Sequence, residues 1–256
     1  MNITATELSI LLPAFIAGLL VTATHVPLGT QVLARGIVFI DLAIAQIAGC
    51  GVLLADQLGF EPQGVAVQIA ALTAALAGAL LLTWTERIWP EVQEAVIGVT
   101  FVLAATGGVL LLASNAHGSE HLRDLLVGQI LWVQPSRLAW AAAVYAVVLA
   151  LWFGTGTRFG HVGFYVLFAV TVTVSVQLVG LYLVFATLIV PPLATRHLKR
   201  RRLPTAWFLS AAGYAIGLAA STAFDLPSGP LIVWTLVAIA LAYQALARPR
   251  QTALAR

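Results

Sequence analysis

The side chains of this sequence that could bind a metal ion or exchange protons include one closely spaced group. His117, Glu120 and His121 fall within five residues, and Asp124 follows them. The order H-x-x-E-H matches a zinc-peptidase pattern, while imidazole and carboxylate together also suit first-row divalent ions that are bound without catalysis. The group is therefore a catalytic zinc site, a loop that collects metal ions, or a solvated turn before the next helix.

The elements that must position these residues are hydrophobic. Of 256 residues, 61% are hydrophobic and 9% are charged, against about 25% charged in an ordinary soluble domain. About 20 apolar residues cross the hydrocarbon core of a bilayer. We therefore expect an all-α polytopic membrane protein with spans near 8–26, 36–55, 63–84, 93–113, 138–154, 163–179, 205–223 and 230–247. No linker or block of charge divides the chain, so we expect residues 1–256 to form a single transmembrane domain.

A ninth apolar segment, residues 180–196, is shorter and contains Pro191 and Pro192. Proline has no backbone N–H and its ring clashes with the preceding turn, so we expect the two prolines to break or end this helix. A broken helix persists at membrane depth only where its freed backbone groups face protein or water. Such segments often border the pathway of a transporter. The sequence thus predicts about eight spans and one proline-interrupted half-helix.

The basic residues predict how the chain is threaded through the membrane. With the N-terminus outside, only Arg123 and Arg137 of the 13 Lys and Arg residues lie on the outer side. Inner loops are enriched in Lys and Arg, so we expect an external (periplasmic) N-terminus and a cytoplasmic C-terminus. The basic run 196–202 is explained by this orientation and by anionic membrane lipid, with no nucleic-acid partner. The segment 117–124 is then external.

Polar residues inside the spans are costly there and are often functional. Asp41 lies about one turn into the second span, where its carboxylate is either a metal ligand or a member of a structural ion pair or hydrogen bond. His25, near the inner end of the first span, is either a metal ligand or part of a helix end satisfied by the backbone. Glu94 begins the fourth span, where the helix dipole favours a carboxylate. The other strongly polar residues within spans are Gln46, Gln68 and Gln177.

Four stretches, in this order along the chain, resemble the permease subunits of bacterial zinc, manganese and iron ABC importers. They are RGIVFID (35–41), EAVIG (94–98), LVGLYLVFATLIVPPLATR (178–196) and FDLPSGP (224–230). The resemblance implies an all-helical permease of the bacterial inner membrane that forms a homodimer around a metal pathway. It also implies two partners, a periplasmic metal-binding protein and a cytoplasmic ATP-binding subunit. The chain itself is then not an enzyme and holds no permanent cofactor, and its cargo is a divalent ion, with zinc favoured by the external histidines over manganese or iron.

Two positions depart from the family pattern. The family places a His four residues after the Asp of the second span, on the same helical face, but this chain has Ala45 there. Gln46 is about 140° around the helix from Asp41, so it cannot take the place of that His. Of the family's Asp and His, this chain therefore retains only the Asp, at Asp41. The loop 154–163, where the family has a helix that docks into the ATPase, has room for about one helical turn. We therefore expect any ATPase contact to centre on Arg200, Arg201 and Arg202.

Three functions stay open on the sequence alone. They are a metal-importer permease, a permease-like membrane protein that is not coupled to ATP hydrolysis, and a membrane metalloenzyme. The last of these needs two histidines on a regular helix, a third protein ligand and a cleft that activates water. Gly118 and Ser119 weaken a helix at this place, and no third ligand is evident. The sequence therefore favours the importer permease.

Overall fold

The structure is a computed structural model that describes residues 5–61, 64–112, 128, 130–155 and 160–252. These residues form helices and no strands, and eight of the helices are long and apolar enough to cross a membrane. The long helices are α1 (Ala5–Arg35), α2 (Ile40–Gln57), α3 (Val65–Ile88), α4 (Gln93–Leu112), α6 (Pro135–Thr155), α7 (Gly160–Val179), α9 (Arg202–Phe224) and α10 (Ser228–Thr252). The shorter ones are α8 (Leu181–Ala194) and the 3-10 turns η1 (Pro90–Val92) and η2 (Ile130–Trp132). The predicted all-α polytopic fold is confirmed.

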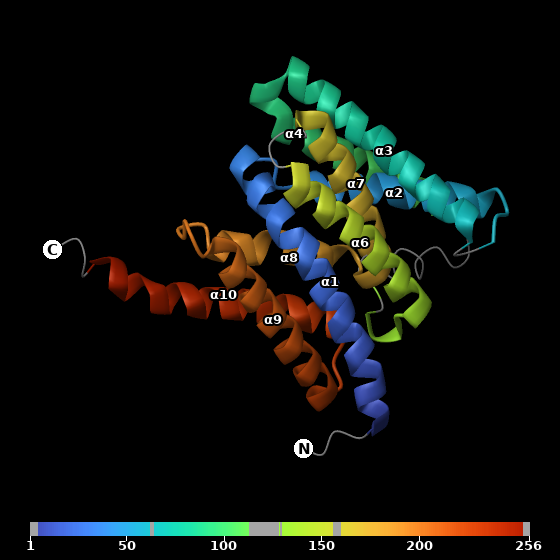
Figure 1. Ribbon diagram of the computed structural model, residues 1–256. Coiled ribbons are helices and arrows are strands. Elements are labelled where there is room, and N and C mark those ends of the chain that lie inside the picture. Colours follow the sequence, from blue (N-terminus) through green and yellow to red (C-terminus); the bar gives the residue numbers. More distant parts are fainter. Residues whose placement is uncertain (1–4, 62–63, 113–127, 129, 156–159, 253–256) are drawn as a thin grey trace.

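The helices pack in two groups on either side of α7 (Figure 1). Helices α2, α3 and α4 form one group, and α1, α8, α9 and α10 form the other, while α7 contacts both. In the most apolar stretch of each span, 72% of the residues of α7 are buried against 11% of those of α4. Phe168 and Val172 of α7 are fully buried in the main apolar core. Helix α7 is therefore the central helix of the bundle, in contact with both groups.

The first span extends beyond its predicted end at residue 26. Helix α1 continues through Pro27 to Arg35, and Gly36 ends it with a φ of 71°. The hydroxyl of Thr30 donates to the carbonyl of Pro27 at 2.7 Å, and α1 packs against α8 and α9. Packing against neighbouring helices allows a membrane helix to continue through a proline. The expectation that the helix ends near His25 was therefore wrong.

The expectation that Pro191 and Pro192 break the ninth segment was also wrong. Helix α8 is short, as predicted, but runs through both prolines to Ala194. In a regular helix the N–H of residue 192 would bond to the carbonyl of Leu188, and that carbonyl oxygen instead packs against the backbone of Gly29 in α1. The hydroxyl of Thr195 donates to the carbonyl of Pro191 at 3.0 Å at the end of the helix. The carbonyl of Leu188, which Pro192 leaves without its helical donor, thus faces protein.

One end of the bundle is held together by charged side chains. Glu86 at the end of α3 lies 3.9 Å from the guanidinium of Arg35 and 2.9 Å from Nδ1 of His161. The guanidinium carbon of Arg35 lies 4.3 Å from the ring centre of Phe164, a cation–π distance. We call Arg35, Glu86, His161 and Phe164 the Arg35 cluster. It places the end of α1, the end of α3 and the start of α7 at the same end of the bundle. The orientation of the bundle in the membrane stays a prediction.

Candidate functional site

Asp41 is the most unusual polar residue among those that the structure describes. It lies in the first turn of α2 and its exposed fraction is 0%. Neither carboxylate oxygen has a hydrogen-bond partner of normal geometry among the described residues, although the N–H groups of Asp41 and Leu42 lie beside it. The predicted structural ion pair is therefore not found in this part of the chain. An unpaired carboxylate at membrane depth is costly, so Asp41 stays the candidate ligand for a passing cation.

The turn before α2 fixes the position of Asp41. The N–H of Phe39 donates to Oε1 of Glu94 at 3.3 Å, and the ring of Phe39 stacks on that of Phe185 in α8 with 6.3 Å between centroids. Glu94 lies in the first turn of α4, as predicted from the helix dipole. Its bond to Phe39 was not predicted, because it joins residues of two different helical hairpins. The carboxylate of Asp41 is thus held at a point where α2, α4 and α8 meet.

A narrow cavity of about 20 Å³ lies beside the next turns of α2, between this helix, α7 and the start of α8. Ala45 and Ala48, which line it, share the helical face of Asp41 because side chains four and seven residues apart align. Its polar lining consists of Gln46, Thr173 and Gln177. The side chain of Thr173 is buried and its hydroxyl oxygen has no hydrogen-bond partner among the described residues.

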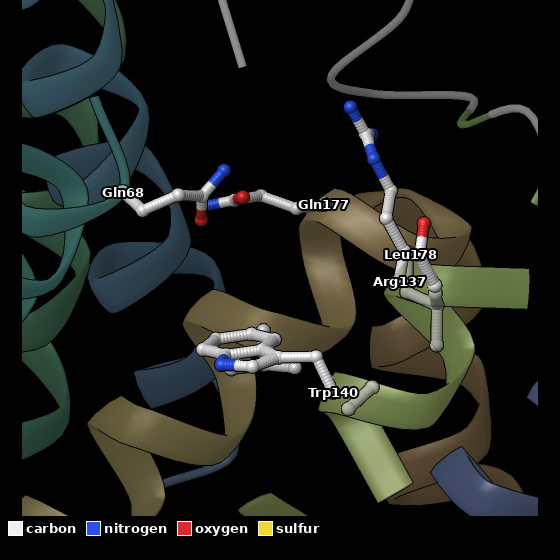
Figure 2. A pocket seen from close by; sticks show the side chains of 8 residues that line it. Gln68, Arg137, Trp140, Gln177 and Leu178 are labelled. Carbon is white, nitrogen blue, oxygen red and sulfur yellow. The ribbon is translucent and has the colours of Figure 1, made fainter. Parts of the chain in front are cut away.

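A wide cavity of about 270 Å³ lies next to the narrow one, between α3, α6 and α7. Figure 2 shows the carboxamides of Gln68 and Gln177 pointing toward one another, with the indole of Trp140 beside them. Arg137, which also lines this cavity, points away from the two carboxamides. Gln177 lines both cavities. Because Gln177 lies at the opposite end of α7 from His161, the cavities lie toward the end of the bundle opposite the Arg35 cluster.

The two cavities and Asp41 form a series of oxygen-bearing groups. The wide cavity offers carboxamides, the narrow cavity offers two carboxamides and a hydroxyl, and Asp41 lies one helical turn beyond Ala45. Among the described residues there is no group of three or more His, Cys, Asp or Glu side chains close enough to share a metal ion. Among the described residues, the groups that face this series are therefore oxygen-bearing side chains.

His25 is separate from this series. It is fully buried in α1, and its Nδ1 donates to the carbonyl of Val21 at 3.0 Å. The backbone thus satisfies one ring nitrogen, although within a continuing helix and not at the expected helix end, while Nε2 has no partner among the described residues. His25 lines neither cavity. A metal-ligand role for it stays a prediction.

The remaining predicted residues lie at the ends of the helices. Arg200 and Arg201 are exposed between α8 and α9, and Arg202 begins α9. Their predicted contact with an ATPase is not tested. The external segment with His117, Glu120, His121 and Asp124 lies outside the described residues, so the collecting loop also stays a prediction.

Sequence reasoning missed Thr173 and the two cavities. A threonine in a membrane helix is usually satisfied by the carbonyl four residues earlier, as Thr171 is by Leu167 at 2.7 Å. The signal that could have found Thr173 is its spacing, because Gln177 follows it by four residues on the same face of one helix. The approach of α2 to α7, which closes the narrow cavity, has no signature in the sequence.

Comparisons with known proteins bear on the whole chain. The ABC 3 transport family matches residues 7–155 and 149–247. A manganese transport system membrane protein MntC of Listeria innocua is 29% identical over an alignment of 231 positions that covers 80% of this chain and 79% of the relative. A probable iron transport system membrane protein of Haemophilus influenzae is 27% identical over an alignment of 177 positions that covers 59% of this chain and 65% of the relative.

The fold also has a counterpart among solved structures. The structure of PsaBC from Streptococcus pneumoniae in complex with Fab contains a chain that matches with a TM-score of 0.75 and 22% sequence identity, over 93% of each chain. This similarity concerns the fold, in which eight apolar helices accompany the shorter α8. Together with the match over nearly the full length of the sequence, it leads to one conclusion: this multi-pass membrane protein belongs to the ABC 3 transport family.

Proposed function

We propose that the chain is the permease subunit of an ABC importer that moves a divalent metal ion across the bacterial inner membrane. The observation that carries this proposal is Asp41, a fully buried carboxylate with no hydrogen-bond partner among the described residues. It lies one helical turn from a cavity lined by carboxamide and hydroxyl oxygens. A divalent cation that passes this point gains a charged ligand without having to displace an existing partner.

Manganese or iron is a better-supported cargo than zinc. The expectation of zinc rested on His117 and His121, which lie outside the described residues. The two relatives are named for manganese and iron transport. Oxygen ligands suit Mn²⁺, and the carboxamides of Gln46, Gln68 and Gln177 in the two cavities, with the nearby carboxylate of Asp41, offer them. We therefore propose manganese as the favoured cargo, with iron as the alternative.

The energy for transport comes, in this proposal, from an ATP-binding partner, so the chain needs no catalytic site of its own. We also propose a single permease domain, a homodimer and a periplasmic metal-binding protein, which are the usual components of such an importer. Helix α6 ends at Thr155 and α7 begins at Gly160, so only residues 156–159 separate them. That interval is too short for a docking helix of more than about one turn.

The proposed ATPase contact is therefore the stretch with the exposed Arg200 and Arg201 and the partly buried Arg202. It follows α8, whose Leu188 carbonyl packs against Gly29 of α1, so a force on this stretch acts through α8 on α1. The short interval between α6 and α7 also keeps a second candidate function open, a permease-like protein that is not coupled to ATP hydrolysis. Co-purification with an ATPase distinguishes the two.

The role of Asp41 can be tested by Asp41→Asn in cells that lack their own manganese uptake. The substitution keeps the size of the side chain and removes its charge, so radioactive manganese uptake should fall about tenfold or more, the effect of losing one charged interaction of about 1.5–3 kcal/mol. The matched control is Asp56→Asn, the same change on the same helix at a partly exposed position. Uptake is divided by the amount of protein in the membrane.

Two results would contradict this role. Unchanged uptake in Asp41→Asn would place Asp41 away from the pathway. A loss of the protein from the membrane, with normal uptake per remaining molecule, would show that Asp41 stabilises the fold instead.

A further inference from the structure

The sizes of the two cavities predict what can enter each of them. A site needs roughly 10–15 Å³ of accessible volume to hold one water molecule. The wide cavity, at about 270 Å³, has room for a cation with its water shell. The narrow cavity, at about 20 Å³, has room for one water molecule or one ion without its shell. A cation that passes from the wide cavity to the narrow one must therefore lose most of its bound water.

Oxygen atoms that could replace this water line the narrow cavity. Gln46 and Gln177 each offer a carboxamide oxygen, and Thr173 offers a hydroxyl. The Thr173 oxygen is the independent sign of a ligand, because it is 4% exposed and has no hydrogen-bond partner among the described residues. Buried polar atoms are almost always hydrogen-bonded in folded proteins. The neighbouring Thr171 follows that rule, with its hydroxyl 2.7 Å from the carbonyl of Leu167.

We propose that the narrow cavity is an all-oxygen binding station for a divalent cation, in which the oxygens of Gln46, Thr173 and Gln177 take the place of water before the ion reaches Asp41. This inference rests on the proposed function and adds to it a site and a basis for ion selectivity. Ala45, which lines the same cavity, contributes no imidazole. The station consequently offers no nitrogen or sulfur ligand.

The absence of such ligands from the lining of the narrow cavity determines which ions it accepts. For a given site, affinity rises from Mn²⁺ through Fe²⁺ to the later metals, so a protein that is to accept manganese needs ligands that give the later metals little advantage. Zinc gains most from Cys and His ligands in a tetrahedral arrangement. Neutral oxygen ligands do not give Zn²⁺ this extra affinity. The station therefore discriminates less strongly against Mn²⁺ than a site that contains histidine would.

The test is Thr173→Val, which removes the hydroxyl and keeps the shape of the side chain. Because this hydroxyl has no partner in the described structure, its removal breaks no hydrogen bond and should leave the fold intact. The control is Thr171→Val, the same change two residues earlier at a buried position outside the cavity. Binding of Mn²⁺ to purified protein in lipid nanodiscs is measured from the electron paramagnetic resonance signal of the free ion.

We expect Mn²⁺ binding to weaken about tenfold in Thr173→Val and less than twofold in Thr171→Val. Uptake of manganese by cells should become correspondingly more sensitive to competing Zn²⁺ in the first variant only. A second pair uses Gln177→Glu and Gln68→Glu. A carboxylate at Gln177, which lines the narrow cavity, should tighten Mn²⁺ binding more than one at Gln68, which lines only the wide cavity.

The outcomes separate this inference from the proposed function. Equal Mn²⁺ binding by the two threonine variants, together with equal effects of the two glutamate variants, would overturn the station while manganese uptake by the unchanged protein still stood. Binding that depends on Thr173, in a protein that gives cells no metal uptake, would support the station and contradict the proposed function. If the threonine variants unfold, the glutamate pair decides alone.

Discussion

The contact between Gly29 of α1 and the Leu188 carbonyl of α8 predicts a large effect of a single methyl group. A Cβ added to Gly29 would overlap the Leu188 oxygen and lie 2.9 Å from its carbonyl carbon and 3.0 Å from Cγ of Pro192. Carbon and oxygen atoms of neighbouring backbones normally stay about 3.3 Å or more apart. Since the overlapping atoms belong to the backbone, the two helices must separate to relieve the overlap. Overpacking of this kind costs about 1–3 kcal/mol.

Gly98→Ala is the matched control for Gly29→Ala. Gly98 is also inside a membrane helix, α4, and nothing lies within 4 Å of a Cβ added there. Both substitutions gain the same helix propensity of about 0.5–1 kcal/mol, so the difference between the two variants isolates the steric cost. We expect Gly29→Ala to be about 1–3 kcal/mol less stable than Gly98→Ala.

Thermal unfolding of the purified protein in detergent, followed by tryptophan fluorescence, measures this difference. Gly29→Ala should have a Tm several degrees below that of Gly98→Ala, because about 1 kcal/mol corresponds to roughly 2–4 °C for a domain of this size. Metal uptake should fall as well, since α8 and α1 are displaced. Equal Tm values for the two variants would refute the inference that close helix contact covers the Leu188 carbonyl.

Two further predictions concern the ends of the bundle. Cysteines placed at Ser119 or Ser228 should react with a membrane-impermeant reagent added outside the cell. A cysteine at Lys199 should not react, because the basic residues predict that residues 196–202 are cytoplasmic. The reverse labelling pattern would contradict the predicted orientation. Co-purification with a candidate ATP-binding subunit should decrease as salt rises from about 50 to about 500 mM, because salt screens contacts between exposed charges. Replacement of Arg200, Arg201 and Arg202 by Ala should abolish the complex, and a salt-resistant complex that survives this replacement would place the contact elsewhere.

Much of the fold could be predicted from the sequence because a lipid environment leaves few choices. Every backbone polar group must be satisfied within the membrane, so each long apolar run becomes a helix, and the predicted spans correspond to the observed ones. The errors occur at Pro27 and at Pro191, where the helix continues. A proline is a local signal, whereas the contacts that compensate it, such as Gly29 against Leu188, come from another helix.

The candidate site was likewise predictable only in part. Asp41 could be selected because a carboxylate within an apolar span is rare and costly, and it is fully buried as expected. Thr173 could not be selected, because only the neighbours of a threonine reveal whether its hydroxyl has a partner. The volumes of the cavities depend on the distance between α2, α3 and α7, and the sequence does not encode that distance in any local pattern. Residue types were thus predictable, and the space between them was not.

The Arg35 cluster has a mechanical consequence for movement within the bundle. Glu86 contacts both Arg35 and His161, so the ends of three helices cannot separate without breaking both of these contacts. A rocking motion that preserves these contacts has its fulcrum there and its largest amplitude at the opposite end. Helix α3 has 24 residues, a lever arm of about 36 Å, so a tilt of about 5° displaces its far end by about 3 Å. That displacement is close to the diameter of a water molecule, and it occurs at the end of α3 that carries Gln68.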